Sequence, residues 1–455
     1  MEQSSNPPLA ALELSNSEGV LTSAPIKLEV HPLREDLYNE LHSRPFYLQA
    51  APAQITHIAV QHAGKLLEEE HQFISSLCER YQTSAPARTM PCFHQDFGLF
   101  NLRWERHLEF STYTFIHEGP LSGTPFEKNG IDYVPKEWLE NIPGQVVVAL
   151  HAVVESSGDE EPGVEVVKDY FDNMRLIGSL PHNGAAKVWT AFRLHDDSFG
   201  RLIIYDRGLS RAQLGRLVQR LLELETYRLM ATLGVPMARQ INSQLNSLES
   251  ELKDLTQQIS QSVDEERSDR ELLSKMSGMA ARSEAFRAQS NYRFAASLAY
   301  YDVVLHRLDA IQEDEITGHL TLREFLSRRL HPAVRTCQTV STRLDDISRR
   351  ISRASDLLRT RVETAVQEQN QKLLSSMDRR ANLQLRLQQT VEGLSVAAIS
   401  YYSIGLIKYL LDSLYGLGVE FDKNIVLGAS VPVVIITVFM GMHHIHKKLI
   451  KDTDH

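Results

Sequence analysis

The stretch LSVAAISYYSIGLIKYLLDSL, residues 394–414, and the stretch IVLGASVPVVIITVFMGM, residues 425–442, lie near the end of a chain of 455 residues. The second stretch has eighteen residues without a charge. A helix of that length spans about 27 Å, close to the thickness of the hydrocarbon core of a bilayer. The first is longer and contains two charges, Lys408 and Asp412. Together they predict two transmembrane helices, and a buried hairpin of core helices is the alternative.

Basic residues lie before the first stretch and after the second. They are Arg379, Arg380, Arg386, Lys447, Lys448 and Lys451. The loop between the stretches carries Glu420 and Asp422 against Lys423 alone. The positive-inside rule then predicts that both termini are cytoplasmic and that the loop is outside.

A long apolar seam precedes the first stretch. Residues 333–392 contain neither glycine nor proline, and apolar or small residues recur there at intervals that are mostly three or four. They are Val340, Leu344, Ile347, Ile351, Ala354, Leu358, Val362, Ala365, Leu373, Met377, Leu387 and Val391. This spacing predicts a coiled-coil-like stalk helix.

The same spacing continues into the membrane stretch through Leu394, Ala398, Tyr401, Gly405, Lys408 and Asp412. Charged side chains inside a span usually face a helix bundle or a water-filled path. The seam therefore predicts a homo-oligomer whose first spans surround an axis. In the alternative, Lys408 and Asp412 both extend toward the outer surface.

The N-terminal half alternates apolar and polar residues as strands do. Five or six strands are expected within residues 55–62, 100–117, 144–154, 185–195 and 200–206, with a helix at 65–81. Ser210 is expected to cap a helix over 211–233, which breaks at Gly234–Pro236 and again at Gly318 and Pro332. The next helix carries an apolar stripe, which is expected to pack against the stalk: Ile241, Leu245, Leu248, Leu252, Leu255 and Ile259.

The expected fold class is an α+β membrane protein with an N-terminal α/β cytoplasmic domain, a long helical stalk and two C-terminal transmembrane helices. The expected boundaries are a flexible tail (1–30), the α/β domain (31–208), the stalk region (209–392), the first transmembrane helix (393–415), the outer loop (416–424), the second transmembrane helix (425–444) and a cytoplasmic tail (445–455).

Composition and motifs argue against two classes of function. A net charge of −10 is not that of a general nucleic-acid binder. The sequence has no GxGxxG, Walker, HExxH or GxSxG motif, so we expect no enzyme and identify no cofactor. Glu105, His107 and Glu109 would share one face of an expected strand and are weak candidates for a metal site. An ion-paired sheet face is the alternative.

Several long motifs resemble a bacterial family of uncharacterised membrane-anchored proteins, the domain of unknown function DUF3422. They include HPLREDLYNELHSRP (31–45), LRWERHLEFSTYTF (102–115) and EFLSRRLHPAVRTC (324–337). The likeness extends over about residues 28–451 and implies the bacterial inner membrane as the location. It implies no activity.

The order of elements also resembles the CorA-type magnesium channels, in which an α/β domain and a long stalk helix precede two C-terminal spans. That resemblance implies a pentamer, a pore lined by the first span and a divalent cation as ligand. The seam and this resemblance together give the following pore or outer-mouth candidates: Tyr401, Gly405, Lys408, Asp412, Tyr415, Gly416, Gly418, Glu420 and Asp422. Gly418 stands where those channels carry an asparagine. The expected function is an oligomer that conducts or senses ions, and the alternative is a membrane-tethered cytoplasmic scaffold or sensor without transport.

Overall fold

The computed structural model describes residues 29–34, 37–38, 48–62, 67–88, 90–121, 123–157, 161–261, 266–416 and 422–451. The chain divides into two compact units. The first comprises Met1–Ile241 and Gln289–Ser341, and the second comprises Asn242–Ala288 and Thr342–His455.

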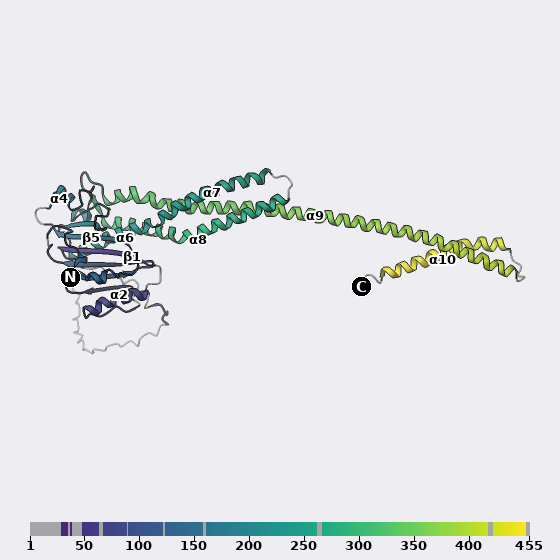
Figure 1. Cartoon of the computed structure of the whole chain (residues 1–455), viewed down its shortest axis with the longest axis horizontal. Helices are drawn as coiled ribbons and strands as arrows, with labels where there is room; N and C mark the ends of the chain where they lie inside the picture. Colours follow the sequence, from purple (N-terminus) through teal and green to yellow (C-terminus); the bar gives the residue numbers. More distant parts are fainter. Residues whose placement is uncertain are drawn as a thin grey trace, which may run out of the picture. The chain divides into compact units, whose positions relative to one another are not determined.

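A mixed nine-stranded sheet forms the centre of the first unit (Figure 1). Its strands are β1 (Ala53–Gln61), β2 (Cys92–Asp96), β3 (Asn101–Arg106), β4 (Phe110–Glu118), β5 (Gln145–Ser156), β6 (Ile177–Leu180), β7 (Ala186–Thr190), β8 (Gly200–Asp206) and β9 (Glu313–Glu315). Their order is β2-β3-β4-β1-β5-β8-β7-β6-β9. All neighbouring strands are antiparallel except β5 and β8. This sheet and the long helices confirm the α+β class.

The expected stretch at residues 100–117 forms two strands, the hairpin of β3 and β4, so the expected stretches hold six strands. The chain turns at residues 107–109, so the alternating pattern does not continue along one strand. The sequence did not predict β2, β6 or β9. The other expected strands are present as β1, β5, β7 and β8.

Helices cover both faces of the sheet because alternate residues of β1 are buried on opposite sides. Ile55 shares a core with Leu217 of α6 (Arg211–Thr232), whereas Ile58 shares another with Ile74 of α2 (Leu67–Arg80). Short helical segments complete this unit: η1 (Gly130–Tyr133), α3 (Lys136–Leu139), α4 (Val164–Asp169) and α5 (Pro181–Gly184).

Helix α6 begins as predicted. The Ser210 hydroxyl accepts a hydrogen bond from the backbone N–H of Gln213, and the Gln213 side chain reaches back to the Ser210 backbone. The helix ends at Thr232, and α7 (Gly234–Gln261) starts two residues later, which confirms the predicted break.

The second unit is helical and contains parts of α7, α8 (Glu266–Ile311) and α9 (Leu322–Gly416), together with α10 (Lys423–Lys451) (Figure 1). All six residues of the predicted α7 stripe are buried. Arg343 of α9 donates to the side chains of Asn246 and Glu249 of α7, at 2.9 and 2.8 Å. Helix α7 therefore packs along α9, as predicted.

Pro332 does not end a helix, contrary to the prediction. It lies inside α9, which runs from Leu322 to Gly416 and also includes Gly393. Proline has a helical φ, but it lacks an N–H donor and its ring crowds the carbonyl four residues earlier, so this long packed helix contains it at a local cost. Gly318 does lie outside the helices, with a φ of +85°.

The predicted seam of α9 is buried in its first part and exposed in its second. Leu344, Ile347 and Ile351 are buried, whereas Leu373 and Leu387 are more than half exposed. Coiled-coil packing between copies stays a prediction. By length and composition, α9 and α10 are both able to span a membrane, and their apolar windows are 11% and 0% buried in the single chain.

Candidate functional site

The candidate metal residues Glu105, His107 and Glu109 do not share one strand face. Only Glu105 lies in β3, and the other two belong to the turn of the hairpin. Within the described ranges, no three His, Cys, Asp or Glu side chains come together as a metal site would require.

Each of the three residues has another contact. Glu105 forms an ion pair with Arg103 at 2.9 Å, and Glu109 accepts two hydrogen bonds from Arg293 at 2.6 and 3.0 Å. The His107 ring stacks on Phe110 with 4.3 Å between centroids. Glu105 and Glu109 are therefore ion-paired and His107 is stacked, and metal binding by any of the three stays a prediction.

The pore candidates lie at the end of α9 and the start of α10. Tyr401 and Lys408 are exposed, and Gly405 and Asp412 are half-buried. Tyr415 and Gly416 are the last residues of α9, and Gly418 and Glu420 lie outside the described residues.

Asp422 has a local structural contact. Its carboxylate accepts hydrogen bonds from the backbone N–H groups of Asn424 and Ile425, at 3.1 and 3.4 Å. It therefore caps the N-terminus of α10. Whether these residues surround a pore stays a prediction.

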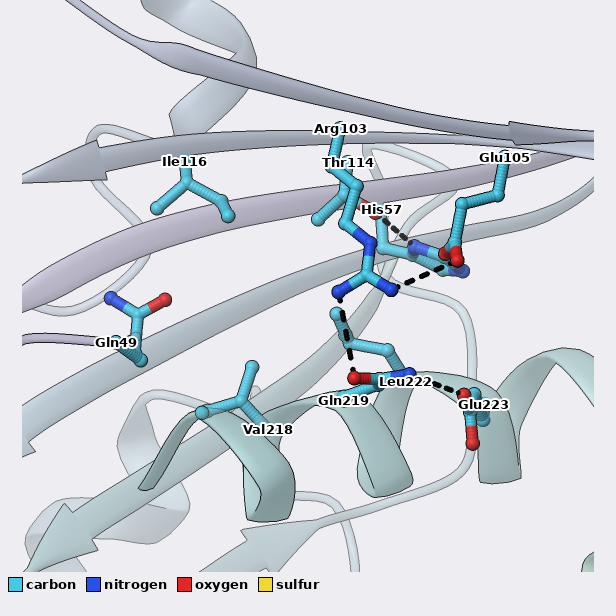
Figure 2. Close-up of a pocket in the computed structure, with 11 residues that line it drawn as sticks. Gln49, His57, Arg103, Glu105, Thr114, Ile116, Val218, Gln219, Leu222 and Glu223 are labelled. Atoms are coloured by element: carbon cyan, nitrogen blue, oxygen red, sulfur yellow. Dashed lines mark hydrogen bonds and ion pairs between the residues drawn. The ribbon is translucent and has the colours of Figure 1, made fainter. Parts of the chain in front are cut away.

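Polar side chains line a cavity between the sheet and α6 (Figure 2). Arg103 and Glu105 project from β3 toward Gln219 and Glu223 of α6. Two adjoining hollows share Glu105 and Glu223, and their volumes are about 40 and 220 Å³. The larger one also reaches Arg307 of α8.

A continuous chain of polar contacts connects these side chains. Arg103 donates to Glu105 at 2.9 Å and to Gln219 at 3.5 Å. Gln219 donates to Glu223 at 2.8 Å, and Arg307 donates its Nε–H to the same carboxylate. The two carboxylates and two guanidinium groups sum to zero charge.

His57 of β1 lies beside these polar contacts, and both of its ring nitrogens are hydrogen-bonded. The Thr226 hydroxyl donates to the Leu222 carbonyl at 2.9 Å, so it accepts from His57 Nε2–H, also at 2.9 Å. The Thr114 hydroxyl then donates to Nδ1 at 2.8 Å. Burial, and next the Arg103 guanidinium, lower the pKa of His57 to about 3, so the ring is neutral at physiological pH.

A second, apolar groove adjoins the polar cavity. It has a volume of about 510 Å³ and shares His107, Phe110 and Tyr227 with the cavity. One face of α8 lines the groove with Ala295, Ala296, Ala299, Tyr292 and Tyr300. The arrangement offers hydrogen-bonding and charged groups in one compartment and an apolar surface in the next.

The sequence did not predict this cavity. The alternation of Arg103 and Glu105 and the four-residue spacing of Gln219 and Glu223 are visible signals of shared faces. Nothing local connects them, because Arg103 and Gln219 are 116 positions apart.

The family model described as "Protein of unknown function (DUF3422)" matches residues 29–449. No curated protein matches the chain. Neither finding supports the resemblance to CorA-type magnesium channels. Since the match covers nearly the whole chain, the protein belongs to the DUF3422 family.

Proposed function

We propose that the protein is a membrane-tethered sensor of the bacterial inner membrane, with a binding role rather than a catalytic one. The observation that carries the proposal is helix α9. It begins beside the sheet of the first unit and continues without a break into an apolar stretch that the single chain leaves exposed. A core helix of a soluble protein would be buried there.

The proposed topology has two spans with both termini in the cytoplasm. Arginines precede the first span and lysines follow the second, as the positive-inside rule requires. The exposed leucines of α9, such as Leu373 and Leu387, provide a surface on which copies of the chain associate.

Cysteine labelling tests the topology. Cys78 and Cys337 are buried and Cys92 is half-buried, so Cys92→Ser gives a background with little reactivity. In that background we expect Ser413→Cys and Asn424→Cys to react with a membrane-impermeant maleimide added outside spheroplasts. Arg379→Cys, on the exposed stalk before the first span, is the matched control and should react only after lysis.

Labelling of residues 413 and 424 only after lysis would place their segment on the cytoplasmic side. The two-span topology would then be wrong.

Ion conduction is the second candidate function. The observation that favours it is the pair of charged residues on an otherwise apolar span: Lys408 is exposed, and Asp412 lies one turn further along α9. In an oligomer, such residues would face a polar path rather than lipid.

Flux measurements in proteoliposomes test this candidate. If the path exists, wild type should pass Mg²⁺ or K⁺ and Asp412→Asn should change the rate. Ser413→Ala, at the neighbouring exposed position, is the control. No flux above that of empty liposomes would leave the tethered sensor as the function.

A further inference from the structure

The polar cavity and the apolar groove of the first unit together form a two-compartment pocket. The inner compartment of about 220 Å³ lies between β3, β4 and α6, and the outer one of about 510 Å³ lies along α8. Their combined size is that of sites for small organic molecules.

One buried hydroxyl in the inner compartment has no partner. Thr112 is 4% exposed and lines the cavity, and its Oγ1 makes no hydrogen bond to any residue that the structure describes. Buried hydroxyls are nearly always satisfied, so an unpaired one beside a cavity indicates a bound molecule or water.

The charged side chains that line the cavity have both hydrogen-bond acceptors and hydrogen-bond donors left over for a ligand. The carboxylates of Glu105 and Glu223 each have free lone pairs besides those that their described partners use. Arg307 donates Nε–H to Glu223, and among the described residues its terminal nitrogens have no hydrogen-bond partner. The cavity can therefore bind an ammonium group and a carboxylate together.

Charge balance restricts the ligand further. The charges of Arg103, Glu105, Glu223 and Arg307 sum to zero. His57 is neutral, and both of its ring nitrogens already have hydrogen-bond partners. Glu223 and Arg307 are only partly buried, so a ligand with a net charge would leave one partly desolvated charge uncompensated, whereas a zwitterion pairs with both signs. The adjoining alanine face and aromatic rings provide an apolar surface for the rest of the molecule.

We propose that this pocket binds a free α-amino acid with a large apolar side chain. The ammonium group lies between Glu105 and Glu223, the carboxylate lies on the terminal nitrogens of Arg307, and the side chain extends over Ala295 and Ala299. This ligand site rests on the proposed sensor function, and it names the molecule that the first unit would detect.

Calorimetry on the full chain in a mild non-ionic detergent tests the proposal. The probes are L-leucine, L-phenylalanine and L-tryptophan. We expect at least one to bind saturably. Three analogues of L-phenylalanine each lack one feature: 2-phenylethylamine has no carboxylate, 3-phenylpropionate has no ammonium and glycine has no side chain. Each should bind about tenfold more weakly or worse, because a site built on polar contacts rejects molecules that leave them unpaired.

Two variants locate the binding. Glu223→Gln should weaken binding at least about tenfold, since a neutral amide replaces the charge that faces the ammonium. Ala299→Trp should abolish binding by filling the groove. Ala299 is exposed, so this change does not disturb the core, and circular dichroism will show whether the fold is kept. Glu165→Gln, an exposed acid on α4, is the matched control and should bind as wild type does.

Failure of all three amino acids to bind would overturn the proposal. So would binding that all analogues share, or binding that Glu223→Gln and folded Ala299→Trp both retain. Cysteine labelling of the same chain in spheroplasts, as described above, tests the tether separately. If the topology is as expected but no amino acid binds, only the proposed ligand site is wrong. If an amino acid binds but the topology differs, only the proposed tether is wrong.

Discussion

At the scale of single residues, Glu109 connects the β3–β4 hairpin to α8. The side chains of Glu109 and Arg293 are 8% and 12% exposed, and two hydrogen bonds join the carboxylate to the guanidinium group. We expect Glu109→Ala to lower the free energy of unfolding by about 3 kcal/mol or more, because it leaves a buried guanidinium without its partner. Urea unfolding followed by tryptophan fluorescence measures this.

Glu165→Ala is the control for that measurement. It removes an ion pair with Lys168 from the surface, and the expected loss is below about 0.5 kcal/mol. A double variant, Glu109→Ala with Arg293→Met, should recover part of the loss. Equal effects of Glu109→Ala and Glu165→Ala would contradict the buried pair.

His57 predicts a dependence of stability on pH. Its pKa is lowered from 6.5 to about 3 by burial and by Arg103, so the unfolded chain binds the proton more tightly than the folded one. The stabilisation is therefore complete above about pH 6.5 and decreases as the pH falls toward 3. Thermal unfolding between pH 7 and pH 4.5 should show a lower midpoint at each step.

The variant His57→Gln separates this contribution from others. Glutamine can still bond to Thr114 and Thr226 but does not titrate, so the midpoint of the variant should fall less steeply over the same interval. The pKa of His151 is lowered to about 4 in the same direction, and that residue is present in both proteins. Parallel curves for the two proteins would show that His57 does not carry the effect.

At the scale of elements, the two parts of the α9 seam should respond differently to truncation. Ile351 is 1% exposed, and Ile351→Ala should lower the free energy of unfolding by about 2–4 kcal/mol. Leu387 is 67% exposed, so Leu387→Ala should leave the unfolding of the single chain nearly unchanged. If copies associate through this surface, Leu373→Ala with Leu387→Ala should lower the mass measured in detergent. Circular dichroism and light scattering provide the two readouts.

The same contrast explains which elements the sequence could predict. The helical period of α7 and α9 and the Ser210 cap are local signals, and the structure follows them. Strand β9 reads Glu-Asp-Glu, a composition that disfavours strands. It pairs with β6 while Glu313 accepts hydrogen bonds from the backbone N–H groups of Leu322 and Arg323 at the start of α9. Such a strand depends on partners that are distant in the sequence, so no local sequence pattern predicts it.

Strand β6 could not be predicted from local sequence either. Gly178 is needed there because a Cβ at that position would lie 2.3 Å from the Trp189 ring of β7. In the sequence, glycine within four residues indicates a loop rather than a strand. The candidate site was missed for a related reason, since Arg103 and Glu223 come from elements that only the tertiary fold brings together.

At the scale of the whole molecule, sequence and structure agree on an α+β chain that ends in two apolar helices. The family match covers the sheet, the long helices and both candidate spans, so the proposed tether and the proposed pocket lie within the same family match. The proposed sensor would need both parts in one chain: a pocket that binds the ligand and an anchor that keeps it at the membrane.

Truncation separates these two parts. A chain that ends after Gly393 lacks both apolar stretches, and we expect it in the soluble fraction, because about 18 apolar residues per helix are what hold a span in a bilayer. A chain that ends after His444 keeps both apolar stretches, and we expect it, like the full chain, to stay in carbonate-washed membranes. Recovery of the shorter chain in washed membranes would show that another segment provides the anchor, and the two-span tether would be wrong.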